Sequence, residues 1–228
     1  MGRSRGELVR PVYVAGPSTA RIPSAPGRIR TCGLLLRRQA LYPLSYGRGP
    51  GGQRSAGPVS VPLVEIALIS DTHLPRGERR VPRAALEICA AADLIVHAGD
   101  LSTLAVLREL ESLGPPVLAV HGNADDAEVR ERLPARASVE ADGARIVVVH
   151  NGGPAKGRLE RMRGRHPDAA AVVFGHSHVP LHETDPESGF QIFNPGSATD
   201  RRRAPTHTMG RATAAGGQLS FAHVDLGA

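Results

Sequence analysis

The feature that most constrains the fold of this chain is a series of short apolar runs after Ser60, each of which ends in a cluster of polar residues. Runs of about five residues rich in Val, Ile, Leu and Ala are typical of buried β-strands. The runs lie at 61–70, 92–100, 116–123, 144–151 and 170–178. Amphipathic stretches at 81–91 and 102–114 separate the first three runs, and a third at 154–165 precedes the last. Strand and helix alternate, so the sequence predicts an α/β fold with a parallel, layered sheet.

The rest of the chain lacks helical intervals. Strand-like pieces follow at 179–184, 190–196, 206–212 and 218–226. This second half therefore predicts an antiparallel or mixed sheet. For the helix expected at 102–114, Ser102 is the expected N-cap and Gly114 the expected stop.

The first 60 residues differ from the rest in composition. They hold ten of the 28 Lys and Arg residues but only one of the 22 acidic residues, Glu7, together with ten Gly and seven Pro. Their net charge is +9, which leaves −3 for residues 61–228. Such a segment buries too little apolar surface to offset its ordering entropy, so we expect residues 1–60 to be disordered. It is either a tail or sequence upstream of the native start, and a basic arm for nucleic acid or acidic lipid is the weaker alternative.

Cysteine usage and hydropathy indicate a cytoplasmic protein. Cys32 and Cys89 are the two cysteines of the sequence, which excludes a disulfide framework and a Cys-x-x-Cys metal site. No stretch approaches the roughly 18 apolar residues of a membrane span, and the N-terminus lacks the apolar run of a secretory signal. The charge of −3 on residues 61–228 argues against nucleic acid as a partner.

Side chains that bind metals stand at the ends of the five runs. They are Asp71, His73, Asp100, Asn123, His150, His176 and His178. Ligand sites of parallel sheets lie at the carboxyl ends of the strands, and residues two apart can face the same point. Singly, an Asp here is more often a helix cap and a His more often a packed residue. Jointly, two Asp, four His and one Asn without a thiolate suit two divalent ions that share one carboxylate.

For several other residues of this region, a structural role has to be weighed against a role in the site. Asp125 is either a partner that orients a ligand imidazole or the N-cap of a helix that begins near Asp126. His97 and His121 are adjacent to small residues and are expected to be packed histidines. The run 201–203 of three arginines could draw phosphate toward the site, although a solvated charge run is the favoured interpretation.

The ordered motifs resemble those of a known family. Asp71-Thr72-His73, Gly99-Asp100, Gly122-Asn123, His150 and Gly175-His176-Ser177-His178 are similar to the motifs of the calcineurin-like metallophosphoesterases, and Asn194-Pro195-Gly196-Ser197 resembles the small bacterial and archaeal phosphodiesterase branch. The resemblance runs from about residue 63 to 226. It implies a four-layer α-β-β-α sandwich at 61–228 with a dinuclear metal centre. Asp71, His73, Asp100 and His178 would hold one ion, and Asp100, Asn123, His150 and His176 the other.

The same resemblance implies a metal-dependent phosphoesterase that hydrolyses small phosphodiesters, with monoesters left open, through a hydroxide that bridges the two ions. Manganese is the expected metal, and zinc, nickel and iron are alternatives. The residues expected to act in catalysis are Asp100, Asn123, Asp125 and His150. Many relatives carry a histidine where Ala124 stands, so we expect esters with acidic leaving groups to be favoured.

A small phosphate ester is thus the expected partner, and assembly into a homo-oligomer stays open. The alternative function is a protein-interaction scaffold on the same fold. Retention of the seven ligands argues against a scaffold, since buried carboxylates whose charge is not neutralised destabilise a protein that does not use them.

Overall fold

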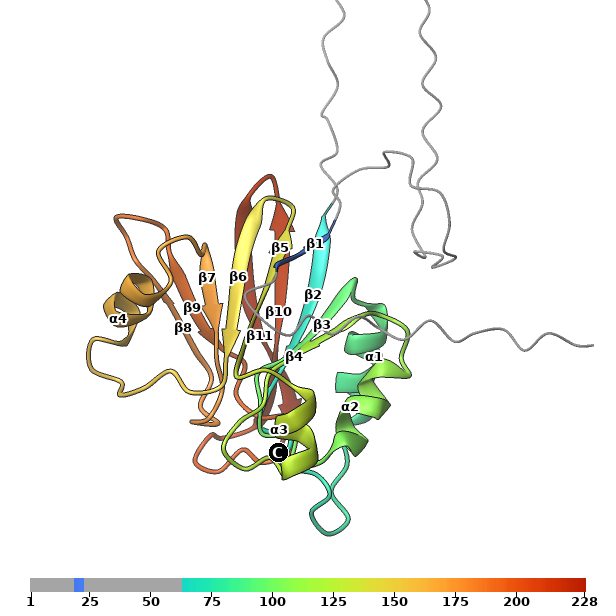
Figure 1. Cartoon of the computed structure of the whole chain (residues 1–228). Coiled ribbons are helices and arrows are strands. Elements are labelled where there is room, and N and C mark those ends of the chain that lie inside the picture. The colour runs from blue at the N-terminus through green and yellow to red at the C-terminus, as the bar shows by residue number, and fades with distance from the viewer. Residues whose placement is uncertain (1–18, 23–62) are drawn as a thin grey trace, which may run out of the picture.

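Two β-sheets pack face to face in the computed structural model, which describes residues 19–22 and 63–228 (Figure 1). The strands are β1 (Thr19–Ile22), β2 (Val64–Ile69), β3 (Leu94–His97), β4 (Val117–Ala119), β5 (Arg136–Ala141), β6 (Ala144–Val149), β7 (Ala171–Val173), β8 (Leu181–Thr184), β9 (Gln191–Asn194), β10 (His207–Ala215) and β11 (Gln218–Gly227). The helices are α1 (Arg83–Ala91), α2 (Leu104–Glu111), α3 (Ala127–Arg132) and α4 (Arg158–Arg165).

Both sheets are mixed. The first has the order β11-β10-β2-β3-β4, in which β2, β3 and β4 are parallel and β10 and β11 are antiparallel to their neighbours. The second has the order β1-β5-β6-β7-β9-β8, in which β6, β7 and β9 are parallel. The late strands therefore divide between the sheets, because β10 and β11 extend the first sheet while β8 and β9 complete the second.

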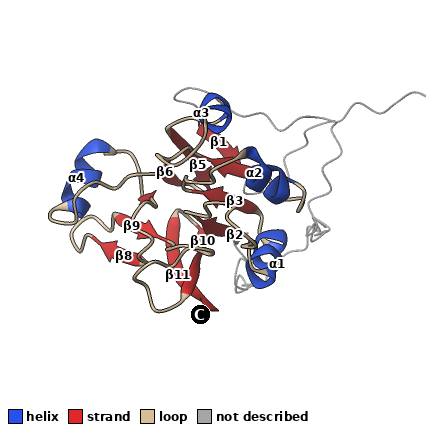
Figure 2. Cartoon of the chain, turned by 90° about the horizontal axis from the view of Figure 1, so that it is seen from below, coloured by secondary structure: helices blue, strands red, loops and turns tan. Residues whose placement is uncertain are grey.

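Three apolar layers hold the fold together. Between the sheets, buried side chains such as Leu68, Val96 and Val148 interlock. Residues of α1, α2 and α3 pack on the outer face of the first sheet. The helix α4 covers the second sheet, where its Met162 packs in one cluster with Phe174. Seen along the sheets in Figure 2, α1, α2 and α3 lie on one side and α4 on the other. The expected four-layer α-β-β-α sandwich is confirmed.

The start of α2 differs from the prediction by one residue. Thr103 is the N-cap, and its hydroxyl accepts a hydrogen bond from the Ala105 N–H. Ser102 instead has a φ of +77°, and its N–H donates to Asp125 Oδ1 at 2.6 Å. This contact from a distant loop holds Ser102 outside the helix, which local sequence does not reveal.

Two other helix boundaries were also predicted too wide. The helix α2 ends at Glu111, before the expected stop at Gly114. The helix α4 begins at Arg158 rather than near residue 154, because Gly157 precedes it in a left-handed conformation with φ +64°.

One strand and a hairpin were not expected. The strand β5 pairs with β6 across Asp142-Gly143, whose φ angles of +43° and +84° suit a tight hairpin turn. The prediction of disorder over 1–60 lies outside the described residues except at 19–22, where β1 pairs in parallel with β5. No helix of the described residues is long and apolar enough to cross a membrane.

Candidate metal centre

The ligand side chains predicted from the sequence meet where five strands end. Ligand atoms lie within 4.8 Å of one another in two groups: Asp71, His73, His178 and Asp100, His150, His176. Loops from both sheets contribute to each region, and the main-chain N–H of His176 donates to both carboxylate oxygens of Asp71 at 3.0 Å. The two groups thus combine residues that follow β2, β3, β6 and β7.

The spacing within the first group suits one cation. Nε2 of His73 and Nε2 of His178 are 3.1 Å apart, and Nε2 of His178 is 3.5 Å from Asp71 Oδ1. Ligands that bind one ion at about 2.0–2.1 Å are separated by about 3–3.5 Å. These three atoms therefore have the separations of ligands that share an ion.

The second group has similar spacing and includes the predicted amide ligand. Nε2 of His150 is 3.1 Å from Asn123 Oδ1 and 3.3 Å from Nδ1 of His176. Asn123 and His176 are exposed, whereas His150 is buried. The second group therefore forms the side of the centre that faces solvent.

Asp100 lies between the two groups. Its Oδ2 is 3.5 Å from Nε2 of His73 and 3.3 Å from Nε2 of His150. Its Oδ1 accepts a hydrogen bond of 2.7 Å from the Ala124 N–H, which fixes the carboxylate in this orientation. One buried carboxylate oxygen is thus placed to contact ions in both groups.

The backbone at the ligands is strained. Most of the predicted ligands have a positive φ, which is uncommon outside glycine: Asp71 (53°), His73 (48°), Asp100 (58°), His176 (71°) and His178 (59°). Each such conformation costs on the order of 1–3 kcal/mol and concentrates at functional sites. Five such conformations are therefore concentrated at the predicted ligands.

Two glycines make room for the ligands. A Cβ on Gly122 would lie 2.1 Å from Asp100 Oδ1, and a Cβ on Gly99 would lie 2.7 Å from Nδ1 of His150. Neither approach is tolerated by a real side chain, since Cβ atoms essentially never come closer than 3.0 Å to another heavy atom. The Gly residues before Asp100 and Asn123 are thus required by the site itself.

Main-chain carbonyls orient two of the imidazoles. Nδ1 of His150 donates to the Ala98 carbonyl at 2.9 Å, and Nδ1 of His178 donates to the Asp200 carbonyl. When each ring is neutral, Nδ1 carries the proton, so the Nε2 lone pair is available to a cation held beside the carboxylates. Sequence reasoning did not identify Asp200 as part of the site.

The carboxylates have opposite electrostatic environments. Burial raises the pKa of Asp71 to about 7, and the nearby charge of His150 only partly offsets this. Burial also acts to raise the pKa of Asp100, but the contact with His150 and the Ala124 N–H outweigh it and hold that pKa at about 2. Asp71 therefore lacks sufficient positive charge in the protein itself, and a cation would supply it.

The histidines are mostly held neutral. Burial lowers the pKa of His73 and of His176, and it lowers the pKa of His178 to about 4. For His150, burial by itself lowers the pKa, but the contact with Asp100 and the charge of that carboxylate raise the pKa overall. Neutral imidazole is the form that binds a metal. Nitrogen and oxygen donors, close spacing and no thiolate together fit a pair of divalent cations.

Asp125 plays a different part from either predicted one. Its carboxylate accepts hydrogen bonds from the N–H groups of Asp100 (3.2 Å), Ser102 (2.6 Å) and Gly122 (2.6 Å), so it braces main chain and does not orient an imidazole. The N-cap of α3 is Asp126, whose Oδ1 accepts from the Val129 N–H. Asp125 holds the loops after β3 and β4 in register with each other.

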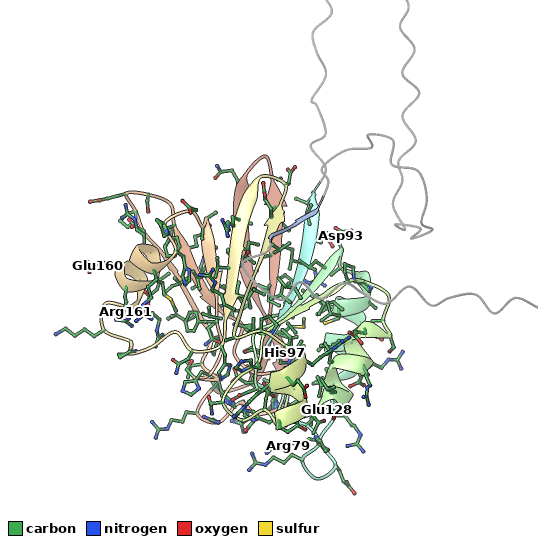
Figure 3. The ribbon with its side chains drawn as sticks, in the orientation of Figure 1. Arg79, Asp93, His97, Glu128, Glu160 and Arg161 are labelled. Atoms are coloured by element: carbon green, nitrogen blue, oxygen red, sulfur yellow. The ribbon has the colours of Figure 1, made fainter. Side chains whose placement is uncertain are left out.

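His97 is fully buried, as predicted, and joins two ligand loops. Its Nδ1 accepts from the Gly99 N–H at 3.2 Å, and its Nε2 lies 3.1 Å from the Thr72 hydroxyl. Figure 3 shows it in the interior of the fold. His121 takes no part in either ligand group, and its Nδ1 lies 3.4 Å from the Gly122 carbonyl.

The segment after β9 supports the first ligand loop. The Ser197 hydroxyl donates to the Asp71 carbonyl at 2.7 Å, and the Thr199 hydroxyl donates to the Thr72 carbonyl at 2.5 Å. The Asn194 amide donates to the Gly175 carbonyl at 2.9 Å. Sequence reasoning noted this Asn-Pro-Gly-Ser motif only as a resemblance, and its supporting role required the structure.

The chain is similar to known proteins both in sequence and in fold. A probable metallophosphoesterase of Methanothermobacter thermautotrophicus is 34% identical over 147 residues, which cover 63% of this chain and 83% of that protein. A phosphodiesterase of Methanocaldococcus jannaschii is 26% identical over 148 residues, covering 58% of this chain and 83% of that protein. The solved structure of Vacuolar Protein Sorting 29 from Cryptosporidium parvum matches with a TM-score of 0.59 at 20% identity, over 73% of this chain and 99% of that one.

The profile of the calcineurin-like phosphoesterase superfamily domain matches residues 64–217, which include every ligand described above. The match includes strands of both sheets and runs from β2 to the turn between β10 and β11. The chain therefore belongs to the calcineurin-like phosphoesterase superfamily.

Proposed function

We propose that this chain is a metal-dependent phosphoesterase that hydrolyses small phosphodiesters at a pair of divalent cations. The observation that carries the proposal is the position of Asp100 Oδ2, 3.5 Å from His73 and 3.3 Å from His150. A carboxylate shared by two groups of nitrogen and oxygen donors is what a two-ion phosphoesterase requires. The phosphodiesterase among the related sequences supports a preference for diesters.

The proposed ligands divide between two ions that share Asp100. Asp71, His73, Asp100 and His178 hold one ion, and Asp100, Asn123, His150 and His176 hold the other. Manganese suits this donor set, with zinc, nickel and iron as alternatives. When bound, two such cations lower the pKa of a water ligand and neutralise charge on phosphoryl oxygens.

The residues of the chain position the reaction. Asn123 and His176 are exposed, while Asp71 and His178 are fully buried, so a phosphate ester approaches from the Asn123 side. Asn123 is a neutral ligand and leaves more positive charge on its ion than a carboxylate would. Asp125 keeps the Asp100 and Gly122 main chain fixed, which limits the motion of the shared carboxylate.

The leaving group obtains little help from the protein. Ala124 is exposed next to the ligand Asn123, and no titratable side chain occupies this position. Esters with acidic leaving groups need the least protonation and are therefore favoured. In an Ala124→His variant, we expect alkyl esters to gain more in kcat/KM than nitrophenyl esters do, and an equal gain on both would contradict this reasoning.

The fold alone also supports a protein-interaction scaffold, because Vacuolar Protein Sorting 29 shares it. At 20% identity, that likeness concerns the fold. The close ligand groups and the raised pKa of Asp71 favour a metal-dependent enzyme instead, since a scaffold gains nothing from buried carboxylates near one another.

The test combines metal analysis with hydrolysis of bis(4-nitrophenyl) phosphate by the wild type and the Asp100→Asn variant. We expect about two cations per chain in the wild type, and loss of bound metal together with at least a hundredfold loss of kcat/KM in the variant. Asp168→Asn is the matched control, because Asp168 is exposed in the turn before β7, at the opposite end of that strand from His176. Unchanged hydrolysis in Asp100→Asn would refute the proposed function.

A further inference from the structure

A cavity of about 540 Å³ with a wall rich in arginine lies beside the metal centre. Arg79 and Arg80 contribute from the loop between β2 and α1, and Arg201 and Arg202 from the loop between β9 and β10. Figure 3 shows Arg79 at the lower end of the molecule, where Figure 1 places the β2–α1 loop. Two segments far apart in the sequence thus form one basic surface.

The positive charge of this surface exceeds its local counter-charge. The Asp200 carboxylate is 3.4 Å from Arg76, 3.4 Å from Arg79 and 4.0 Å from Arg202. One carboxylate cannot neutralise three guanidinium groups, and Asp200 is the one acidic side chain among the residues that line the cavity. The arginine side chains also stay accessible, with 44% exposure for Arg79 and 51% for Arg202.

The loop that carries Arg201 and Arg202 also contacts the metal centre. The Asp200 carbonyl accepts the hydrogen bond from Nδ1 of His178. Asp200, whose carboxylate lies near the arginines, therefore also orients a proposed metal ligand. Thr199, another cavity residue, donates to the Thr72 carbonyl between Asp71 and His73.

The chemistry of the lining selects a phosphate group on an organic molecule. Guanidinium groups bind phosphate through paired N–H donors and do so better than other cations of proteins. Pro82, Ala198 and Leu226 supply an apolar part of the wall. The volume falls in the range of small-molecule sites, which is about 300–1,000 Å³.

We propose that this cavity binds a second phosphate group of the substrate, so that the preferred substrates are small molecules that carry one phosphate on the arginines and one phosphodiester at the metal centre. This inference rests on the proposed function, because it assigns a substrate class to the same site. The arginines act in binding and hold the substrate in one orientation.

The kinetic test uses two esters that differ by one phosphate: thymidine 5′-(4-nitrophenyl phosphate) with and without a 3′-phosphate. We expect the wild type to show at least a fivefold higher kcat/KM for the 3′-phosphorylated ester. In the double variant Arg79→Gln, Arg202→Gln this ratio should fall to near one. The control is Arg108→Gln, since Arg108 is also an exposed arginine but pairs with Glu128 on the outer helices, and it should keep the wild-type ratio. A wild-type ratio near one, or a ratio that survives in the double variant, would overturn the inference.

A binding measurement separates this inference from the proposed function. The full chain, with cations removed by a chelator, is titrated with inorganic pyrophosphate by calorimetry. We expect Kd to be at least fivefold weaker in the double variant than in the wild type and in Arg108→Gln. Equal Kd values would overturn the anion site even if hydrolysis proceeds. Pyrophosphate binding combined with equal kcat/KM for the two esters would show that a free anion occupies the cavity, and would overturn the substrate assignment. Failure of the proposed function instead appears as no hydrolysis of either ester.

Discussion

The Gly122→Ala substitution tests whether the position of the Asp100 carboxylate controls activity. The added Cβ would lie 2.1 Å from Asp100 Oδ1 and 2.7 Å from the Asp100 main-chain nitrogen. Rotation of the carboxylate relieves only the first contact, so the main chain of Asp100 must also move. To reach the 3.0 Å that Cβ contacts keep, Oδ1 has to retreat by about 1 Å.

Such a displacement has a large expected effect on rate. A misplacement of about 1 Å in a catalytic arrangement costs on the order of a hundredfold. It also weakens the hydrogen bond of 2.7 Å from the Ala124 N–H to Asp100 Oδ1 and the bond of 2.6 Å from the Gly122 N–H to Asp125. We therefore expect kcat/KM for bis(4-nitrophenyl) phosphate to fall about a hundredfold, with less metal bound per chain.

A matched control is Gly164→Ala in α4. No atom lies within 4 Å of a Cβ built at Gly164, and Ala is favoured over Gly inside a helix by about 1 kcal/mol. This variant should keep wild-type activity and unfold at the same or a higher temperature. The reasoning fails if Gly122→Ala retains kcat/KM within threefold of the wild type while binding the full complement of metal.

Three other substitutions test two residues that support the site and one residue of the core. Asp125→Asn should reduce the free energy of unfolding by about 1.5–3 kcal/mol, because an amide offers one acceptor atom where the carboxylate accepts three N–H groups. Urea unfolding measures this free energy, and a change below about 0.5 kcal/mol would contradict the reasoning. His97→Phe should cost about 1–3 kcal/mol by leaving the buried Thr72 hydroxyl and Gly99 N–H without their partner, as thermal unfolding at constant metal concentration would reveal. Burial raises the pKa of Cys89 to about 12, against 9.0 in the unfolded chain, so above pH 9 the unfolded chain binds fewer protons and stability falls as pH rises. Cys89→Ala should flatten that slope between pH 9 and pH 11, and an equally steep slope in the variant would show that the thiol is not its cause.

The ligand set could be predicted because each of its signals is local. An apolar run predicts a strand, the polar residues after it stand at the strand end, and parallel strands bring those ends to one edge of a sheet. Asp71, Asp100 and His176 each follow such a run directly. Helix boundaries were predicted less well, because the start of α2 depends on a hydrogen bond from the Ser102 N–H to Asp125, which belongs to a loop after another strand.

The amino-acid sequence by itself determined the alternation of elements and the identity of the donors, since hydrophobic period and side-chain chemistry are properties of short segments. Only the tertiary structure decided how the donors are held and what surrounds them. The buried His97 contacts both Thr72 and Gly99, and the Asp125 carboxylate accepts hydrogen bonds from three main-chain N–H groups. Arg79 and Arg202 both lie within 4.0 Å of the Asp200 carboxylate. These contacts form between distant segments, so their energies depend on how the two sheets pack and leave no periodic signal along the chain.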